Sequence, residues 1–232
     1  MAIYAISDLH LSFGTNKPMH VFGDKWKDHP LIVKENWLKI VGEDDYVLIP
    51  GDISWGINLE EADPDLAFIE SLPGKKIMSK GNHDYWWCTN SKFRKHFEER
   101  GYKTLSILHN NAYKIGDYVV CGTRGWKTPN DDDFSQEDRK ILNRELERLK
   151  LSLKEGQKLG GEIIVMLHFP PIDKDHMPNE FGRLLKEYDV KTCIYGHIHG
   201  KDNEKWESEF IDGIWYHIVT CNLINFIPLK VK

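Results

Sequence analysis

Residues 75–84 read KKIMSKGNHD, a short apolar run that ends in a cluster of polar side chains. The run Lys76–Met78 has the residue content of a buried β-strand, and Gly81-Asn82-His83-Asp84 follows it closely. Ligands of open α/β sheets bind at the carboxyl ends of strands, so polar residues at this place point to function. The same arrangement recurs along the chain, and this recurrence decides the fold.

Four further apolar runs also end in polar residues. These are Asp8-Leu9-His10 after AIYAIS, Gly51-Asp52 after YVLIP, His168 after EIIVML, and Gly196-His197-Ile198-His199-Gly200 after TCIY. Because the carboxyl ends of neighbouring parallel strands share one edge, residues spread over 190 positions of sequence can converge there. Asp8 and His10 alternate, as do His197 and His199, so each pair can reach one metal from an extended strand end.

The convergent residues form a candidate metal-ligand set of seven: Asp8, His10, Asp52, Asn82, His168, His197 and His199. One zinc-like centre takes about three or four protein ligands, so seven suit two metals with one shared ligand. A carboxylate can bridge two metals, whereas an imidazole cannot. The set has no thiolate, which favours Mn²⁺, Fe²⁺ or Zn²⁺ over a softer ion. The alternative is that these are core histidines and capping aspartates, but so many buried unpaired groups would be costly without a cation.

Helical patterns separate the strands. Apolar spacing predicts helices over Leu31–Val41 and Leu59–Leu72, and a longer helix that follows Asp131-Asp132-Asp133 and ends near Gly160-Gly161. We interpret the Asp triplet as the cap of that helix rather than as a cation site. Turns at Gly116-Asp117 and Asp212-Gly213 predict two antiparallel hairpins. The fold class is therefore α/β (α+β), with a mixed sheet or two packed sheets covered by helices.

Composition limits the organisation and the compartment. The 232 residues contain no repeat and no long Gly/Ser/Pro linker, so we expect one domain over residues 1–232. Lys+Arg 31 against Asp+Glu 36 excludes a nucleic-acid site carried by net charge alone. The longest apolar runs are too short to span a bilayer, and the N-terminus has no secretory leader pattern. Four cysteines without a CxxC motif favour reduced thiols, and we expect a cytoplasmic protein.

The five clusters, in their order and spacing, resemble the calcineurin-like metallophosphoesterase superfamily from residue 8 to residue 199. The resemblance implies a two-sheet sandwich flanked by helices, with the metals at the C-terminal ends of the strands. It also implies that His83 faces the phosphate and protonates the leaving oxygen, and that Asp84 orients His83. The ligands it implies are Asp8, His10, Asp52 and His199 for one metal, and Asp52, Asn82, His168 and His197 for the other, with Asp52 bridging.

These roles predict a hydrolase that acts on phosphoric ester bonds. Two adjacent cations neutralise phosphate charge and make a bridging hydroxide available near neutral pH, and this hydroxide would attack phosphorus. The expected substrate is a small phosphorylated molecule, with monoester, diester and pyrophosphate all open. The alternatives are a nuclease, disfavoured by the charge balance, and a non-catalytic scaffold of the same fold, disfavoured because His83 and Asp84 are both present. We expect no membrane partner, and the oligomeric state stays open.

Several residues near the motifs have two interpretations. Arg124, between glycines at a strand end, is either a phosphate clamp or part of a surface ion pair. Tryptophans near the motifs either pack structurally, which we favour, or stack on substrate. The long connection Gly14–His29 is a lid candidate over the metals. We expect His96 to face solvent. We interpret His20, His29 and His176, which lie in irregular segments near the motifs, as structural residues rather than as substrate contacts.

Overall fold

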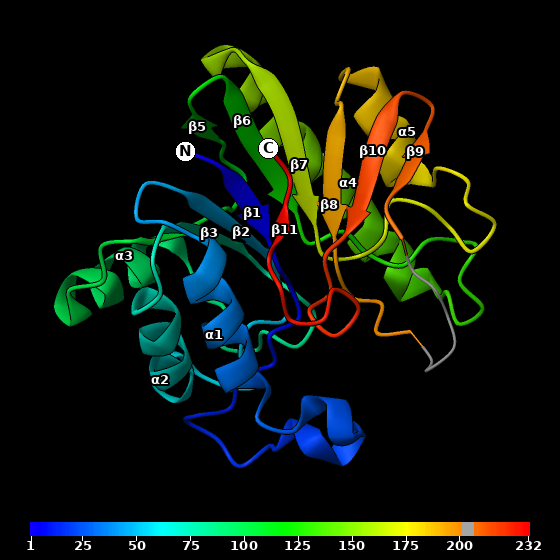
Figure 1. Ribbon diagram of the computed structural model, residues 1–232. Coiled ribbons are helices and arrows are strands. Elements are labelled where there is room, and N and C mark those ends of the chain that lie inside the picture. Colours follow the sequence, from blue (N-terminus) through cyan, green and yellow to red (C-terminus); the bar gives the residue numbers. More distant parts are fainter. Residues whose placement is uncertain (201–206) are drawn as a thin grey trace.

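The computed structural model describes residues 1–200 and 207–232, and in it two β-sheets pack face to face between two groups of helices (Figure 1). The first sheet has the strand order β11-β1-β2-β3-β4. Strands β1 to β4 run parallel, and β11 pairs antiparallel to β1 at the edge. The bounds are β1 Ile3–Ala5, β2 Tyr46–Pro50, β3 Lys75–Ser79, β4 Leu105–Ile107 and β11 Leu229–Lys230.

The second sheet has the order β5-β6-β7-β8-β10-β9. Its four central strands are parallel, and each edge strand is the antiparallel partner in a hairpin. Both hairpins turn where the sequence predicts, at Gly116-Asp117 and at Asp212-Gly213. The bounds are β5 Tyr113–Ile115, β6 Tyr118–Thr123, β7 Glu162–Leu167, β8 Thr192–Tyr195, β9 Glu209–Ile211 and β10 Ile214–Ile218.

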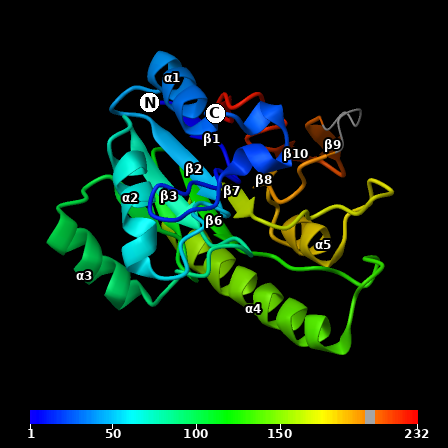
Figure 2. The same ribbon diagram turned by 90° about the horizontal axis from the view of Figure 1, so that it is seen from below.

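Helices cover the outer face of each sheet, as the two views show (Figures 1 and 2). Helices α1 (His29–Ile40), α2 (Leu59–Glu70) and α3 (Asn90–Arg100) lie against the first sheet. Helices α4 (Gln136–Leu159) and α5 (Glu180–Glu187) lie against the second. Two short 3₁₀ turns, η1 (Met19–Phe22) and η2 (Asp24–Trp26), precede α1. None of the helices in the described part of the chain has the length and apolar character needed to cross a membrane.

The alternation of side chains along the strands builds three apolar clusters. In β7, Ile164 and Met166 point between the sheets, whereas Val165 and Leu167 point toward the α4 side. Every one of these four side chains is fully buried, which is the pattern of a central parallel strand covered on both faces. The two-sheet sandwich expected from the sequence is therefore confirmed.

The start of α4 differs from the expectation. Ser135 is its N-cap and forms a capping box with Asp138, in which each side chain bonds to the other residue's backbone. The preceding aspartates have other partners, because Asp131 accepts from the Thr128 backbone and Asp133 pairs with Lys127. The predicted end at Gly160 is confirmed. The prediction that the Asp triplet caps this helix was therefore wrong.

His96 in α3 also differs from the expectation that it faces solvent. Its side chain is 12% exposed and its Nε2 lies 2.7 Å from a carboxylate oxygen of Asp63, on the neighbouring helix α2. The four cysteines are all free thiols, as expected from their spacing.

The two sheets meet where β1 and β10 end. The backbone N–H of Ser7 donates to the carbonyl of Val219 at 2.8 Å, and the N–H of Cys221 donates to the carbonyl of Ser7 at 3.0 Å. These bonds form a parallel bridge between Ser7 and Thr220. The residues just after β1 and β10 are thereby held together, and the first polar cluster begins at the next residue, Asp8.

Candidate functional site

All seven predicted ligands lie in loops that directly follow parallel strands, at one end of the sandwich. Three strands of the first sheet (β1, β2 and β3) and two of the second (β7 and β8) supply them. Two groups of ligand atoms each lie within 4.8 Å of one another: Asp8, His10 and His199, and Asp8, Asp52 and His168. Convergence at the strand ends, predicted from the sequence, is what the structure shows.

The Asp8 carboxylate has one satisfied and one unsatisfied oxygen. Oδ2 accepts from the Ser7 hydroxyl at 2.5 Å and from the His197 backbone N–H at 3.0 Å. Oδ1 is buried and has no hydrogen-bond partner in the described chain. It lies 3.9 Å from His10 Nε2 and 3.7 Å from His199 Nε2. A buried carboxylate oxygen without a donor, facing two imidazole nitrogens, fits the coordination of a cation.

Asp52 lies between the two groups of ligands. Its Oδ1 accepts from the His83 backbone N–H at 2.8 Å. Its Oδ2 lies 3.8 Å from His10 Nε2 and 3.4 Å from His168 Nε2. One oxygen is therefore within reach of ligands from both sheets, which is the position a bridging carboxylate requires.

The Asn82 side chain contacts both histidines that follow strands of the second sheet. Its Oδ1 lies 2.7 Å from His168 Nε2 and 2.9 Å from His197 Nδ1. His168 Nδ1 lies 3.0 Å from the carbonyl of Pro50. A carbonyl can only accept, so Nδ1 of His168 carries the proton and Nε2 is left free to bind a metal.

Asn222 is a site residue that sequence reasoning missed. Its Oδ1 lies 3.0 Å from His199 Nδ1, and its Nδ2 donates to the His199 carbonyl at 2.8 Å. The second contact fixes which end of the amide faces the ring, so His199 donates from Nδ1 and presents Nε2 to the site. Asn222 follows the Thr220 bridge rather than a recognisable motif, and only the meeting of the two sheets places it here.

Burial and mutual charge set the ionisation of the ligands. Burial raises the pKa of Asp8. Burial also opposes the charge of Asp52, but His168, His10 and the backbone N–H of His83 together outweigh it and lower the pKa of Asp52. For His168, burial is outweighed by Asp52 together with Asp8 and the Pro50 carbonyl, which raise its pKa to about 9. A metal bound at Nε2 of His168 would therefore take the place of a proton. Burial lowers the pKa of His10 and of His197 to about 3, so both rings are neutral and able to bind a metal at physiological pH.

Two motif glycines allow the backbone to approach these carboxylates. A Cβ atom on Gly81 would lie 2.1 Å from Asp52 Oδ1, and one on Gly196 would lie 2.3 Å from Asp8 Oδ2. Neither distance is compatible with a side chain. Four of the ligands also have left-handed backbones, with φ of 57° at Asp8, 44° at His10, 50° at Asp52 and 71° at His197. Strain of this kind is concentrated at functional sites.

His83 lies at the open side of the ligand cluster. Its side chain is 36% exposed, its Nε2 lies 4.0 Å from Asp52 Oδ2, and its ring packs on Trp55 with centroids 4.7 Å apart. Trp55 also stacks on His10 at 4.9 Å. The partial exposure and the closeness to Asp52 place the His83 imidazole where a phosphate bound at the cluster would reach it.

Asp84 does not orient His83, which corrects the implied role. Its carboxylate accepts from four backbone N–H groups and from the indole of Trp86. The Nδ1 of His83 has no partner among the described residues. Asp84 is fully buried, and burial together with the Asp52 charge raises its pKa to about 6. Its carboxylate instead accepts from the backbone of Gly81 and of residues 52–54, and so connects these two loops.

Arg124 lies in an ion pair that is buried rather than on the surface. Its guanidinium is 3.4 Å from Oε1 of Glu145, which is itself 1% exposed, and it stacks on Trp126 at 4.2 Å. The backbone carbonyl of Arg124 accepts from the N–H of His168 at 2.9 Å. This pairing favours the ion-pair interpretation, and a phosphate contact by Arg124 stays a prediction.

The connection Gly14–His29 runs beside the metal-ligand cluster. Trp26 packs edge-on against His199, with ring centroids 5.7 Å apart. His29 lies 2.9 Å, through Nε2, from the carbonyl of Leu9, within the first motif. This segment therefore forms part of the wall around the ligands, and its role as a lid stays a prediction.

Comparisons with known proteins agree with this geometry. Residues 1–201 match the family described as calcineurin-like phosphoesterase. The Gene 66 protein of Mycobacterium phage D29 is 37% identical over 199 residues, which cover 86% of this chain and 79% of that protein. The Gene 66 protein of Mycobacterium phage L5 is 35% identical over 78 residues, which cover 34% of this chain and 37% of the phage protein. The chain thus aligns with less than half of the L5 protein.

Solved structures share the fold at low sequence identity. Phosphopantetheinyl hydrolase (PptH) from Mycobacterium tuberculosis superposes with a TM-score of 0.59 at 12% identity, covering 99% of this chain and 95% of that one. The protein TT1561 of Thermus thermophilus gives 0.58 at 13% identity, covering 95% and 89%. The family match covers residues 1–201, and this chain therefore belongs to the calcineurin-like phosphoesterase family.

Proposed function

We propose that the protein hydrolyses a small phosphomonoester or phosphodiester with the help of two divalent cations, with Mn²⁺, Fe²⁺ and Zn²⁺ as the candidates. The position of Asp52 carries this proposal, because its Oδ2 lies within 4 Å of histidines from both ligand groups. The residues that would hold one cation are Asp8, His10, Asp52 and His199, and those for the other are Asp52, Asn82, His168 and His197.

When bound, the two cations supply positive charge that neutralises the phosphate and lowers the pKa of water enough to provide hydroxide near neutral pH. The chain's own residues do the rest. Asp8 and Asp52 present carboxylate oxygens that backbone and hydroxyl donors hold in place. His83 is the proton donor to the leaving oxygen, because it is partly exposed and adjacent to Asp52.

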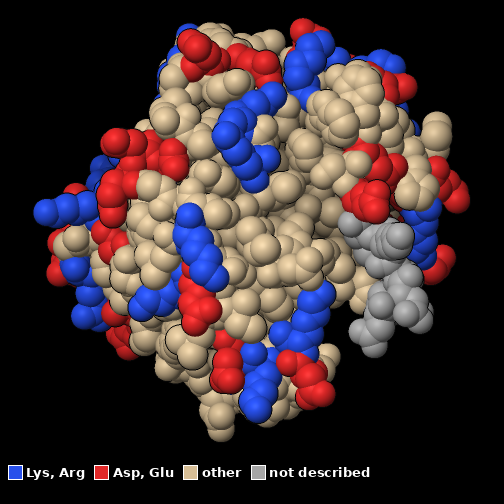
Figure 3. Space-filling model, in the orientation of Figure 1, with Lys and Arg blue, Asp and Glu red and all other residues tan. Residues whose placement is uncertain are grey.

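A small substrate is favoured over a nucleic acid by the distribution of charge. Lys and Arg are interspersed with Asp and Glu over the face shown in Figure 3, where a polynucleotide would need a continuous basic groove. The net charge of −5 adds to this argument. The name of the M. tuberculosis neighbour refers to a small phosphorylated group, but at 12% identity that likeness extends to the fold alone.

The test is hydrolysis by the purified, metal-loaded protein of 4-nitrophenyl phosphate, bis(4-nitrophenyl) phosphate and single-stranded DNA, with each candidate metal. We expect turnover of at least one nitrophenyl ester, and a loss of about 10²-fold or more in Asp52→Asn, because the bridge loses its charge. Asp44→Asn, in the exposed turn between α1 and β2, is the matched control. Cleavage of DNA alone would establish the nuclease alternative, and no hydrolysis of any probe with metals bound would establish a scaffold.

A further inference from the structure

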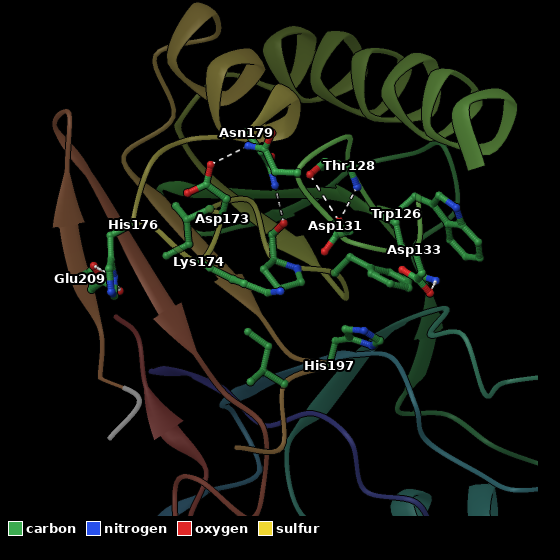
Figure 4. Close-up of a pocket in the computed structure, with 16 residues that line it drawn as sticks. Trp126, Thr128, Asp131, Asp133, Asp173, Lys174, His176, Asn179, His197 and Glu209 are labelled. Atoms are coloured by element: carbon green, nitrogen blue, oxygen red, sulfur yellow. Dashed lines mark hydrogen bonds and ion pairs between the residues drawn. The ribbon is translucent and has the colours of Figure 1, made fainter. Parts of the chain in front are cut away.

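A cavity of about 630 Å³ opens beside the candidate metal ligands, and His197 is part of its wall (Figure 4). Loops that follow β6, β7 and β8 enclose it, together with Glu209 of β9. The volume falls within the range of about 300–1,000 Å³ that small-molecule sites occupy. A group attached to a phosphate at the metal centre would therefore have room to extend into this cavity.

Aromatic rings form the wall nearest the ligands. Phe169 packs on His197 with ring centroids 4.1 Å apart, and Trp126 packs on Phe169 at 5.1 Å. Ile172 and Ile198 add aliphatic surface. This wall suits a ring or another carbon-rich group of the substrate.

The charged part of the lining is acidic. Among its described residues are four carboxylates and two lysines, and each lysine already has an acidic partner. Lys127 pairs with Asp133, and Lys174 lies 3.0 Å from Asp132. Figure 4 shows Trp126 and Asp133 on one side of the cavity, and His176 with Glu209 on the other, where their side chains are 2.8 Å apart.

Two carboxylates of the lining have only neutral hydrogen-bond partners among the described residues. Asp131 accepts from the Thr128 backbone N–H at 2.6 Å, and Asp173 accepts from the side-chain amide of Asn130 at 2.8 Å. Asp173 also accepts from the Met177 backbone N–H at 3.0 Å. Hydrogen bonds to neutral donors fix these carboxylates but do not cancel their charge, so each would repel an anion placed in the cavity.

From this arrangement we propose that the cavity binds the organic part of the substrate, and that this part has an apolar face and carries no negative charge of its own. Hydroxyl or amino groups on it would donate to Asp131 and Asp173. The inference rests on the proposed function, since it requires phosphate to bind at the neighbouring ligands. It narrows the substrate class to phosphoesters of neutral or cationic alcohols and excludes those with a second anionic group.

Three coumarin phosphates provide the test on the Mn²⁺-loaded protein: 4-methylumbelliferyl phosphate, its analogue with a carboxylate on the 4-methyl carbon, and its analogue with an aminomethyl group at position 4. We expect kcat/KM for the neutral and cationic esters to exceed that for the carboxylated ester by at least about tenfold. The same ratio is then measured in the double variant Asp131→Asn/Asp173→Asn. It should fall to about threefold or less, because asparagine keeps the acceptor oxygen and removes the charge. A ratio within one variant does not depend on how much of the protein is folded.

Asp44→Asn removes one negative charge outside the cavity, and it should leave the ratio unchanged. Equal kcat/KM values for the three esters in the unmodified protein would overturn the inference, as would a ratio that the double variant does not alter. Hydrolysis of 4-nitrophenyl phosphate distinguishes these failures from failure of the proposed function. If that ester is turned over while the coumarin esters are not discriminated, the metal centre stands and the cavity assignment falls.

Discussion

Two hydrogen bonds connect the segment of Asp52 with that of Asp84, and each runs from a backbone N–H of one segment to a carboxylate of the other. The N–H of Asp52 donates to the Asp84 carboxylate at 2.9 Å, and the Asp52 carboxylate accepts from the N–H of His83, the residue before Asp84, at 2.8 Å. The loops after β2 and β3 are thus fixed to each other at the candidate bridging ligand. Asp84 therefore supports the site by positioning Asp52, and not by accepting a hydrogen bond from the His83 ring.

Asp84→Ala should therefore act on stability and metal binding. Four backbone N–H groups and an indole N–H would lose their acceptor, and we expect the free energy of unfolding to fall by about 3 kcal/mol or more. Denaturant unfolding and metal titration measure both effects. A variant with unchanged stability and metal affinity but a displaced pH–rate profile would instead support the orienting role.

His83→Ala should lower kcat while both metals stay bound, because His83 protonates the leaving oxygen and is not a ligand. We expect a loss of about 10²–10⁴-fold on an alkyl phosphate and a much smaller loss on 4-nitrophenyl phosphate, whose leaving group needs no proton. Elemental analysis provides the control for metal content. Equal activity of variant and unmodified protein on the alkyl ester would show that another group protonates the leaving oxygen.

Asn222→Ala should weaken one metal site. Without Oδ1 of Asn222 the His199 ring loses the partner that fixes its tautomer, and metal affinity should fall by about 10–100-fold. Calorimetric titration with Mn²⁺ measures this directly. Asn222→Asp keeps an acceptor for Nδ1 and should retain most of the affinity, and equal affinities in all three proteins would refute the role.

Asp65 should make stability fall as the pH rises. Its carboxyl group is fully buried, accepts from the Phe13 backbone N–H at 2.7 Å and contacts the Ser54 hydroxyl, and burial raises its pKa to about 6. The native state holds this proton more tightly than the unfolded chain, so the stabilisation is complete below about pH 4 and is lost as the pH rises to about 6.

Asp65→Asn removes that titration, so the variant should gain roughly 1–3 kcal/mol relative to the unmodified protein between pH 4 and pH 7. Chemical unfolding over this range, with Asp44→Asn as the reference for an exposed carboxylate, measures the difference. A constant difference across the range would contradict the assignment.

The strand ends and the ligand set were predictable because the chemistry is local in sequence. A buried apolar run followed by Asp, Asn or His specifies both a strand and where its ligand emerges, and β8 has the predicted bounds Thr192–Tyr195. The hairpin at Asp212-Gly213 was equally clear, since both residues have the positive φ that this dipeptide favours.

What the sequence could not supply are contacts between side chains that only the packed sandwich brings together. Asn222 reaches His199 because β10 ends beside β1, and no local pattern records that. His96 is drawn from solvent by Asp63 of another helix. The Asp84 carboxylate is occupied by the loop of Asp52, which lies about 30 residues earlier in the chain.

Function and stability make opposite demands at four ligands with left-handed backbones, namely Asp8, His10, Asp52 and His197. Glycine adopts such conformations without strain, so the backbone alone would favour glycine at these positions. Selection for stability alone should therefore favour glycine wherever the side chain makes no structural hydrogen bond, and activity would be lost. Over generations, only continued demand for turnover would keep aspartate and histidine at these four places.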